Sequence, residues 1–309
     1  MRNQSVTREP PIVVLPEIDD LVSMEKPREV LKEVENIVRL MFDETSFDFI
    51  RSVFDDILTL FAGKFPDYKR CNTRFHDLQH TTDAFLAMAR LMHGAHVEGA
   101  SLTETDVFLG LIAALLHDTG YIQRQDDERG TGARYTLIHV QRSVEFMEYY
   151  FNSRGFSQRD FRICSSFLEC TDLDVEVCDI PFGSDSYRML GKMMGTADLL
   201  GQMAARNYLE KLIFLYYEFE EAGVPGFNGE LDLLRKTADF YEMAKIRLDN
   251  DLSGVRHYMQ AHFRERWNID KDLYEAAIEK NVSYLRFILD SHPDEYRTYL
   301  RRALVKEWC

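Results

Sequence analysis

The chain has 309 residues, of which 45% are hydrophobic, and its 37 basic and 52 acidic residues give a formal net charge of −15. That hydrophobic content can form a large core, whereas the charge argues against a nucleic-acid polymer or an anionic membrane as a partner. No apolar run is long enough to span a membrane, and residues 1–17 contain no apolar signal segment. The five cysteines are odd in number and lack Cys-x-x-Cys spacing, which indicates reduced thiols. We therefore expect a cytoplasmic protein without a membrane span.

Helical spacing of apolar residues dominates the chain, and alternating strand patterns are nearly absent. Residues 1–24 hold three prolines and no helical period, so we expect an N-terminal arm that is partly disordered. Residues 25–309 are expected to form a single all-α domain, a compact multi-helix bundle. The pattern predicts helices over residues 27–42, 46–65, 76–96, 103–118, 135–151, 161–177, 184–206, 208–221, 231–252, 273–289 and 293–306, with shorter helices between 252 and 266.

Two of these helices carry polar residues that suggest a shared site. His76 and His80 are four residues apart, so both imidazoles are expected on one face of their helix. A capping-box pattern at residues 103–106 opens the next helix, whose uncharged run over 109–116 ends in His117 and Asp118. Such a helix is buried, and its polar end needs a partner. A metal ion is the simplest one.

Asp198 interrupts an apolar, small-residue helix in the same unexpected way. Together, His80, His117, Asp118 and Asp198 supply two imidazoles and two carboxylates, a mixed set that suits a divalent ion holding a nucleophilic water. Asp118 has two oxygens and could bridge two ions. We therefore expect one or two divalent ions, and His/Asp sites of this kind accept Mn, Mg, Zn, Fe or Ni.

Three further features have simpler interpretations. His93 and His96 are expected to be solvated surface histidines at the frayed end of their helix. Residues 123–132 form a charged loop that is either a solvated connection or a mobile lid over a substrate. The aromatic, amphipathic helix over residues 208–221 is explained by core packing or by the surface of a possible homodimer.

Four segments follow one another in a recognisable order: FHDLQH at 75–80, ALLHD at 114–118, CTDL at 170–173 and TADL at 196–199. They are similar to the Tyr-His-Asn-x-x-His, Ala-x-x-His-Asp, Ala-Thr-Asp-Met and Cys-Ala-Asp-Leu segments of cyclic-nucleotide phosphodiesterases. The chain thus resembles the HD-domain superfamily of metal-dependent phosphohydrolases, and most of all its phosphodiesterase branch. The resemblance covers about residues 70–245.

The resemblance implies roles for individual residues. His80, His117, Asp118 and Asp198 would bind the first metal, and Asp118 would also reach a second ion. His76 would be the general acid that protonates the leaving oxygen, a role that suits an imidazole close to a metal ligand. The remaining candidates, which would surround the ligands without binding the ion, are Asp77, Thr171 and Asp172.

The chain also departs from the phosphodiesterase pattern. Tyr121 and Ile122 follow Gly120 where that branch has a further histidine, and Thr237 stands where it has a purine-binding glutamine. Asp77 replaces an asparagine. His139, near the start of a later helix, is similar to the extra histidine that other HD families use for a second metal, and it could otherwise contact substrate.

The sequence therefore predicts an all-α, HD-type hydrolase in which metal-activated water cleaves a phosphodiester. The expected substrate is small and phosphorylated, with a cyclic or other small nucleotide as the first candidate. Three alternatives stay open: a nucleotide phosphomonoesterase or pyrophosphohydrolase, a non-catalytic ligand-sensing module, and an oxygen-activating di-iron site that would require His139.

Overall fold

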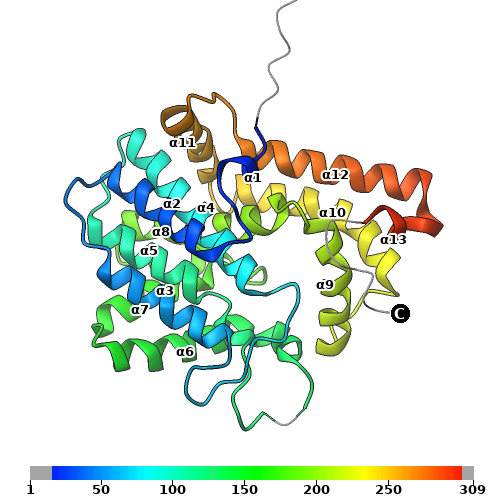
Figure 1. The fold of residues 1–309 in the computed structure, drawn as a ribbon, viewed down its shortest axis with the longest axis horizontal. Helices are drawn as coiled ribbons and strands as arrows, with labels where there is room; N and C mark the ends of the chain where they lie inside the picture. The colour runs from blue at the N-terminus through cyan, green and yellow to red at the C-terminus, as the bar shows by residue number, and fades with distance from the viewer. Residues whose placement is uncertain (1–15, 128, 301–309) are drawn as a thin grey trace, which may run out of the picture.

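Helices account for the regular structure in the residues that the computed structural model describes, 16–127 and 129–300 (Figure 1). Within these ranges there are thirteen α-helices and no strand, so the prediction of a compact all-α fold is confirmed. The α-helices are α1 (Ile18–Leu21), α2 (Pro27–Arg39), α3 (Asp48–Phe61), α4 (Leu78–Val97), α5 (Glu104–Leu116), α6 (His139–Arg154), α7 (Gln158–Glu169), α8 (Asp185–Ala204), α9 (Tyr208–Ala222), α10 (Glu230–Asp249), α11 (Tyr258–Trp267), α12 (Leu273–Ser291) and α13 (Tyr296–Tyr299). Short 3-10 helices are η1 (Thr119–Tyr121), η2 (Gly132–Ile138), η3 (Val177–Asp179), η4 (Val255–His257) and η5 (Pro293–Glu295).

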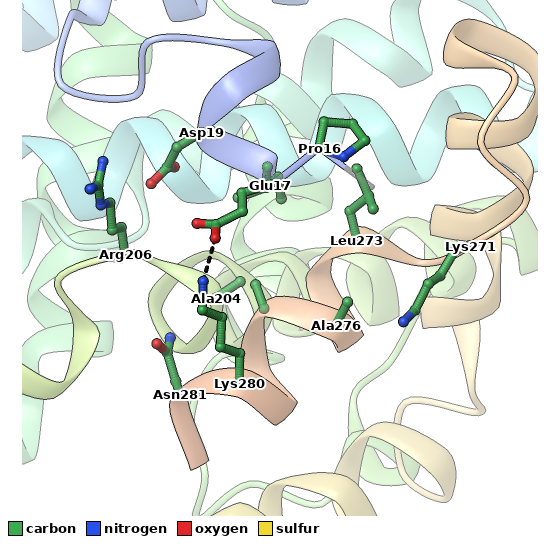
Figure 2. A pocket seen from close by; sticks show the side chains of 12 residues that line it. Pro16, Glu17, Asp19, Ala204, Arg206, Lys271, Leu273, Ala276, Lys280 and Asn281 are labelled. Carbon is green, nitrogen blue, oxygen red and sulfur yellow. Dashed lines mark hydrogen bonds and ion pairs between the residues drawn. The ribbon is translucent and has the colours of Figure 1, made fainter. Parts of the chain in front are cut away.

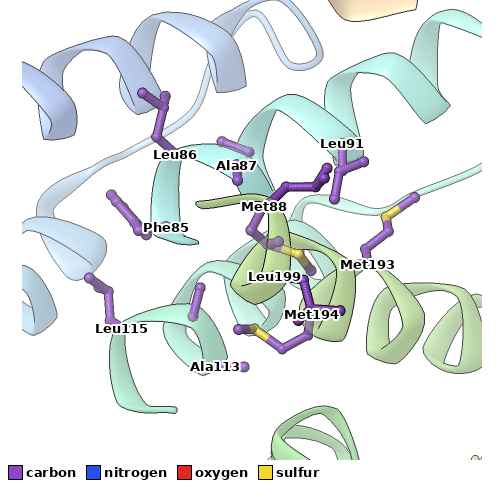
Figure 3. Packing of buried hydrophobic residues seen from close by; sticks show 14 of the residues in the cluster. Phe85, Leu86, Ala87, Met88, Leu91, Ala113, Leu115, Met193, Met194 and Leu199 are labelled. Carbon is purple, nitrogen blue, oxygen red and sulfur yellow. The ribbon is translucent and has the colours of Figure 1, made fainter. Parts of the chain in front are cut away.

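Helix α4 lies at the centre of the packing. It contacts α2, α5, α8 and α11, and every residue from His80 to Ala95 is buried. Figure 3 shows Phe85 and Met88 of α4 packed near Leu115 of α5 and Met194 of α8. A helix surrounded on all sides has no solvent face, and this explains the small and apolar residues along its length. The metal-ligand candidate His80 is thus fixed in the most enclosed element of the fold.

The structure corrects the expected start of this helix. Asp77 is the N-cap, and its side chain accepts a hydrogen bond from the backbone N–H of His80 at 3.0 Å. An aspartate satisfies a free N–H of the first turn in this way. His76 therefore precedes the helix, and the prediction that His76 and His80 share a helical face is wrong. Their rings still approach each other, with centroids 5.8 Å apart.

Two other predicted helices are shorter in the structure. Helix α7 ends at Glu169, so Thr171 and Asp172 lie beyond it rather than within a helix that continues to residue 177. At the end of the chain, η5 and α13 cover only Pro293–Tyr299, and residues 301–306 of the predicted last helix lie outside the described residues. No helix of the described residues is long and apolar enough to cross a membrane.

The described part of the expected N-terminal arm packs against the domain. Residues 1–15 lie outside the described residues, but Ile18, Val22 and Met24 are buried. Figure 2 shows Glu17 facing Lys280 of α12 beside a cavity of about 230 Å³, and the two side chains form an ion pair. Residues 16–24 thus add a short helix, α1, to the bundle.

His93 is not the surface histidine that the sequence suggested. It is 2% exposed, and its Nδ1 lies 3.2 Å from Nδ1 of His262 on α11. The prediction failed because α11 covers the end of α4, while His96 three residues later is only partly buried. Burial lowers the pKa of His93 to about 4, helped by the positive charges of His96 and Arg266. Burial also holds the pKa of His262 well below its usual value, and Arg90 and His93 add to the effect.

The pair makes stability depend on pH. Both histidines are neutral in the folded protein, so between pH 6.5 and about 4 the unfolded chain binds more protons, and the free energy of unfolding falls as the pH falls. Each histidine contributes a slope of at most about 1.4 kcal/mol per pH unit. Urea unfolding at pH 7.0 and 5.0 should show a smaller loss for His93→Leu than for the unchanged protein. Equal losses would contradict this account.

Candidate metal centre and adjoining cavity

Three helices bring the predicted metal ligands together. His80 lies in the first turn of α4, and Asp198 lies in the second half of α8. His117 is the C-cap of α5, and Asp118 follows it as the residue that starts η1. His80, His117 and Asp118 are buried, and the side chain of Asp198 is 14% exposed.

Their ligand atoms converge on one point. His80 Nε2 lies 3.1 Å from both Asp118 Oδ2 and Asp198 Oδ1. His117 Nε2 lies 3.4 Å from Asp118 Oδ2, 3.6 Å from Asp198 Oδ1 and 3.3 Å from His80 Nε2. Ligands bound to one ion at about 2.0–2.2 Å are themselves about 2.8–3.6 Å apart along the edges of an octahedron or tetrahedron. The separations among His80, His117 and Asp118 therefore fit a single divalent ion, and Asp198 Oδ1 lies within 3.6 Å of both imidazoles.

The hydrogen bonding of the group also fits an ion. Asp118 Oδ2 is buried and has no hydrogen-bond partner of normal geometry, although two imidazole nitrogens lie close to it. His117 Nδ1 donates to the carbonyl oxygen of Ala114 at 2.8 Å, which leaves its Nε2 lone pair for a metal. Buried polar atoms rarely go unpaired without a reason. The buried group of His80, His117 and Asp118, whose ligand atoms lie within 4.8 Å of one another, could hold a metal ion.

The charges in this group depend on one another. Burial would lower the pKa of His80, but the neighbouring carboxylates of Asp118 and Asp198 raise it to about 10. Burial opposes the ionisation of both carboxyl groups, yet the imidazoles of His117 and His80 hold their pKa values below the usual range. Two buried carboxylates that share the same imidazole neighbours need positive charge nearby. A divalent cation would supply that charge in place of the imidazole protons.

Two glycines allow the helices to come close enough. A Cβ on Gly201 of α8 would lie 2.9 Å from the backbone nitrogen of Ala84 on α4, so a larger residue would push Asp198 away from His80. A Cβ on Gly120 would lie 2.0 Å from the carbonyl oxygen of His139. The bare backbone of Gly120 thus lets α6 begin directly beside η1.

This close contact places His139 next to the centre. Its Nε2 lies 3.8 Å from Asp118 Oδ1, the oxygen that does not face His80, and its Nδ1 lies 2.6 Å from the carbonyl oxygen of Thr136. His139 is therefore positioned on the outer side of Asp118. That position is compatible with either role predicted for it, a second ion or a substrate contact.

His76 is held by a carboxylate that the sequence analysis missed. Its Nδ1 lies 2.7 Å from Oε2 of Glu218 on α9, and Glu218 Oε1 accepts hydrogen bonds from the backbone N–H groups of Arg74 and Phe75 at 2.7 Å. Burial would raise the pKa of Glu218, but hydrogen bonding to His76 lowers it. Tyr121 stacks on the other side of the His76 ring, with centroids 4.1 Å apart. The ring is therefore fixed, and its Nε2 is 3.4 Å from the Tyr121 hydroxyl.

Helix α9 also supports Asp77. Lys211 Nζ lies 2.8 Å from Asp77 Oδ1, and Lys211 and Glu218 are seven residues apart on one face of α9. That spacing in the sequence was the available signal for this contact. It was hidden by the three other glutamates of the same helix. Asp77 contacts the backbone of His80, as expected of a residue that surrounds the ligands.

Thr171 and Asp172 are less directly involved than predicted. Both line the cavity described below, but the Thr171 hydroxyl donates to the carbonyl oxygen of Leu168, and Asp172 Oδ1 accepts from the backbone N–H of Asp174. These hydrogen bonds stabilise the loop after α7 and do not reach the four ligands.

The loop over residues 123–132 is attached at both ends. Asn72 joins its two ends, because its side chain donates to Gln123 Oε1 at 3.0 Å and accepts from the backbone N–H of Gly132 at 2.8 Å. Thr131 is hydrogen-bonded to Glu221 of α9. None of the described residues of this loop lines the cavity, so the structure gives no support to the lid interpretation.

A cavity of about 670 Å³ opens beside the ligand group. One end is polar and contains His76, His139 and the ligands His80, Asp118 and Asp198. A further wall is mostly apolar and comes from α9, the loop after it and α10. Thr237, which stands where the phosphodiesterase pattern has a glutamine, lies in this wall.

A family model described as Npun_R2479-like matches residues 125–248, and the chain is similar to that family over this segment. The segment includes His139, Asp198 and the helices of the apolar wall, but it excludes His80, His117 and Asp118. Searches of curated proteins and of solved structures gave no match. The family's description names no activity, so the chemistry has to be inferred from the site.

The ligand geometry predicts how metal content responds to mutation. Asp118→Asn removes a charge without changing size, and the protein should lose most of its bound divalent metal when it is dialysed against metal-free buffer. Asp172→Asn, in the same cavity but without contact to the ligand group, should keep its metal. Inductively coupled plasma mass spectrometry of both purified proteins measures this. Full metal content in Asp118→Asn would show that the ligand assignment is wrong.

Proposed function

We propose that this protein is a metal-dependent hydrolase that cleaves a phosphodiester of a small substrate. The single observation that supports this most is the convergence of His80, His117, Asp118 and Asp198 beside a cavity that also contains a fixed imidazole, His76. The resemblance of the sequence to HD-domain phosphohydrolases supports the same proposal. It adds a cyclic nucleotide as one candidate substrate.

The residues present would divide the chemistry between them. A divalent ion bound by the four ligands would supply a water of lowered pKa as the nucleophile and would polarise a phosphoryl oxygen. His76 would donate a proton from Nε2 to the leaving oxygen. Glu218, through its contact with His76 Nδ1, would keep the imidazole ring oriented and balance its positive charge. Burial holds the pKa of Tyr121 well above its usual value, so its hydroxyl stays protonated and can donate a hydrogen bond within this end of the cavity.

The charges around the cavity favour a diester over more highly charged substrates. Lys236 is the one lysine or arginine among the described residues that line it, and its ammonium group is already paired with Asp232 at 2.8 Å. Asp172, Asp174 and Asp239 also line it. A diester carries a single negative charge, whereas a monoester or pyrophosphate brings two or more and would need more basic side chains. This ranks the phosphomonoesterase and pyrophosphohydrolase alternatives below diester cleavage.

The decisive experiment is a hydrolysis screen of the metal-analysed protein with manganese added. Bis(p-nitrophenyl) phosphate should be cleaved, p-nitrophenyl phosphate should be cleaved much more slowly, and Asp118→Asn should abolish both activities. Bound metal without cleavage of either compound or of cyclic nucleotides would shift the proposal to a ligand-sensing module or to oxygen chemistry. Absence of bound metal would overturn the proposal.

Variants of His76 and Glu218 test the proposed proton transfer. His76→Ala should keep its metal and lose about 10²- to 10⁴-fold in kcat. The loss should be larger with a phenolate leaving group than with p-nitrophenolate, because the weaker base needs less protonation. Glu218→Gln should lower kcat by about tenfold, or ~1.4 kcal/mol, with little change in KM. Equal losses for both leaving groups in His76→Ala would contradict a general-acid role.

A further inference from the structure

We propose that the substrate of this site carries an apolar alkyl or aryl ester group, which binds to the mostly apolar wall of the cavity formed by α9, α10 and the loop between them. This inference rests on the proposed diester hydrolysis and specifies its substrate class. It differs from the expectation of a nucleotide, because a nucleobase requires hydrogen-bonding groups where this wall offers apolar ones.

The wall is built from apolar residues at helical spacing. Leu212, Leu215 and Phe219 follow one face of α9, and Leu233 and Phe240 lie seven residues apart on α10. The loop between the helices adds Phe227, whose ring packs against Phe219 with centroids 5.3 Å apart. These side chains together give the cavity a large apolar lining.

The apolar surface continues to the mouth of the cavity. Ten large apolar or aromatic side chains are exposed in the described part of the chain, and four of them line this cavity: Leu137, Ile138, Leu173 and Met243. Leu137 is 66% exposed, Leu173 52% and Met243 65%. They come from η2, from the loop after α7 and from α10. Exposed apolar side chains collected around one opening from three separate segments indicate a binding surface rather than chance exposure.

Helix α10 contributes three polar side chains to the cavity, of which Thr237 and Lys236 are already engaged and the third is the carboxylate of Asp239. The Thr237 hydroxyl donates to the carbonyl oxygen of Leu233 at 2.9 Å, within its own helix. Lys236 is paired with Asp232 and also contacts the carbonyl oxygen of Gly226. The wall therefore presents neither a free amide nor an arginine with which to distinguish one base from another. A ligand that covers it gains from burial of apolar area.

The test uses substrates that share one leaving group. Methyl p-nitrophenyl phosphate and butyl p-nitrophenyl phosphate both release p-nitrophenolate, so a difference between them reports the ester group that stays on phosphorus. With the full-length, manganese-loaded protein, kcat/KM for the butyl ester should exceed that for the methyl ester at least tenfold, since each buried methylene is worth about fourfold. Calorimetric Kd values for dibutyl and dimethyl phosphate should differ in the same direction, which gives a readout independent of turnover.

Substitutions at the mouth of the cavity (the rim) test whether its exposed apolar side chains cause the preference for the butyl ester. Met243→Ser and Leu173→Ser should each reduce the butyl-to-methyl ratio at least threefold. Ile246→Ser is the matched control, because Ile246 lies one turn further along α10 and is 60% exposed but does not line the cavity. Its ratio should equal that of the unchanged protein. Size-exclusion chromatography of the same variants shows whether the rim instead covers a second copy of the chain.

The outcomes separate this inference from the proposed function. Cleavage of both esters with equal kcat/KM, or a preference for cyclic AMP over the butyl ester, would leave diester hydrolysis standing and overturn the apolar substrate. A rim variant that changes the oligomeric state but not the ratio would overturn it as well. If neither ester nor any cyclic nucleotide is cleaved and dibutyl phosphate binds no better than dimethyl phosphate, both proposals fail.

Discussion

The burial of two carboxylates between apolar helices is the constraint on which the rest of this protein depends. Asp118 and Asp198 are held close to His80 and His117 at separations of 3.1–3.6 Å, in a region where α4, α5 and α8 provide almost only apolar side chains. Burying like charges together is costly unless positive charge is supplied. The helices that hold these groups are therefore the ones with the most extensive packing, and α4 is enclosed from His80 to Ala95.

A second layer of contacts connects this centre to the cavity. Glu218 and Lys211 both project from one face of α9, and they hold the successive residues His76 and Asp77. Asp77 in turn caps the helix that carries His80. One surface helix thus fixes the free imidazole and the start of the helix with a ligand, and these contacts keep the proposed acid at a constant position relative to the ligands.

Much of this arrangement could be predicted from the sequence, because residues forced into apolar surroundings are visible there. His117, Asp118 and Asp198 each end or interrupt an apolar run, and the structure places them together with His80. The contacts of Glu218 could not be predicted, since a carboxylate on a charged amphipathic helix looks the same whether it faces solvent or a histidine. The error at His76 was local, because the Asp77 cap sets the start of α4 after His76, whereas the error at His93 arose from long-range packing, because α11 buries the end of α4.

The side chains of α9 have different freedom to vary. Lys211 and Glu218 are tied to polar groups that any reaction at this centre would use, whereas Leu212, Leu215 and Phe219 line the cavity. Substitutions at these three apolar positions can reshape the space for a substrate while the contacts of Lys211 and Glu218 stay in place. Evolution, or a small library of designed variants at these three positions, could thus change the preferred substrate while the protein keeps the same chemistry.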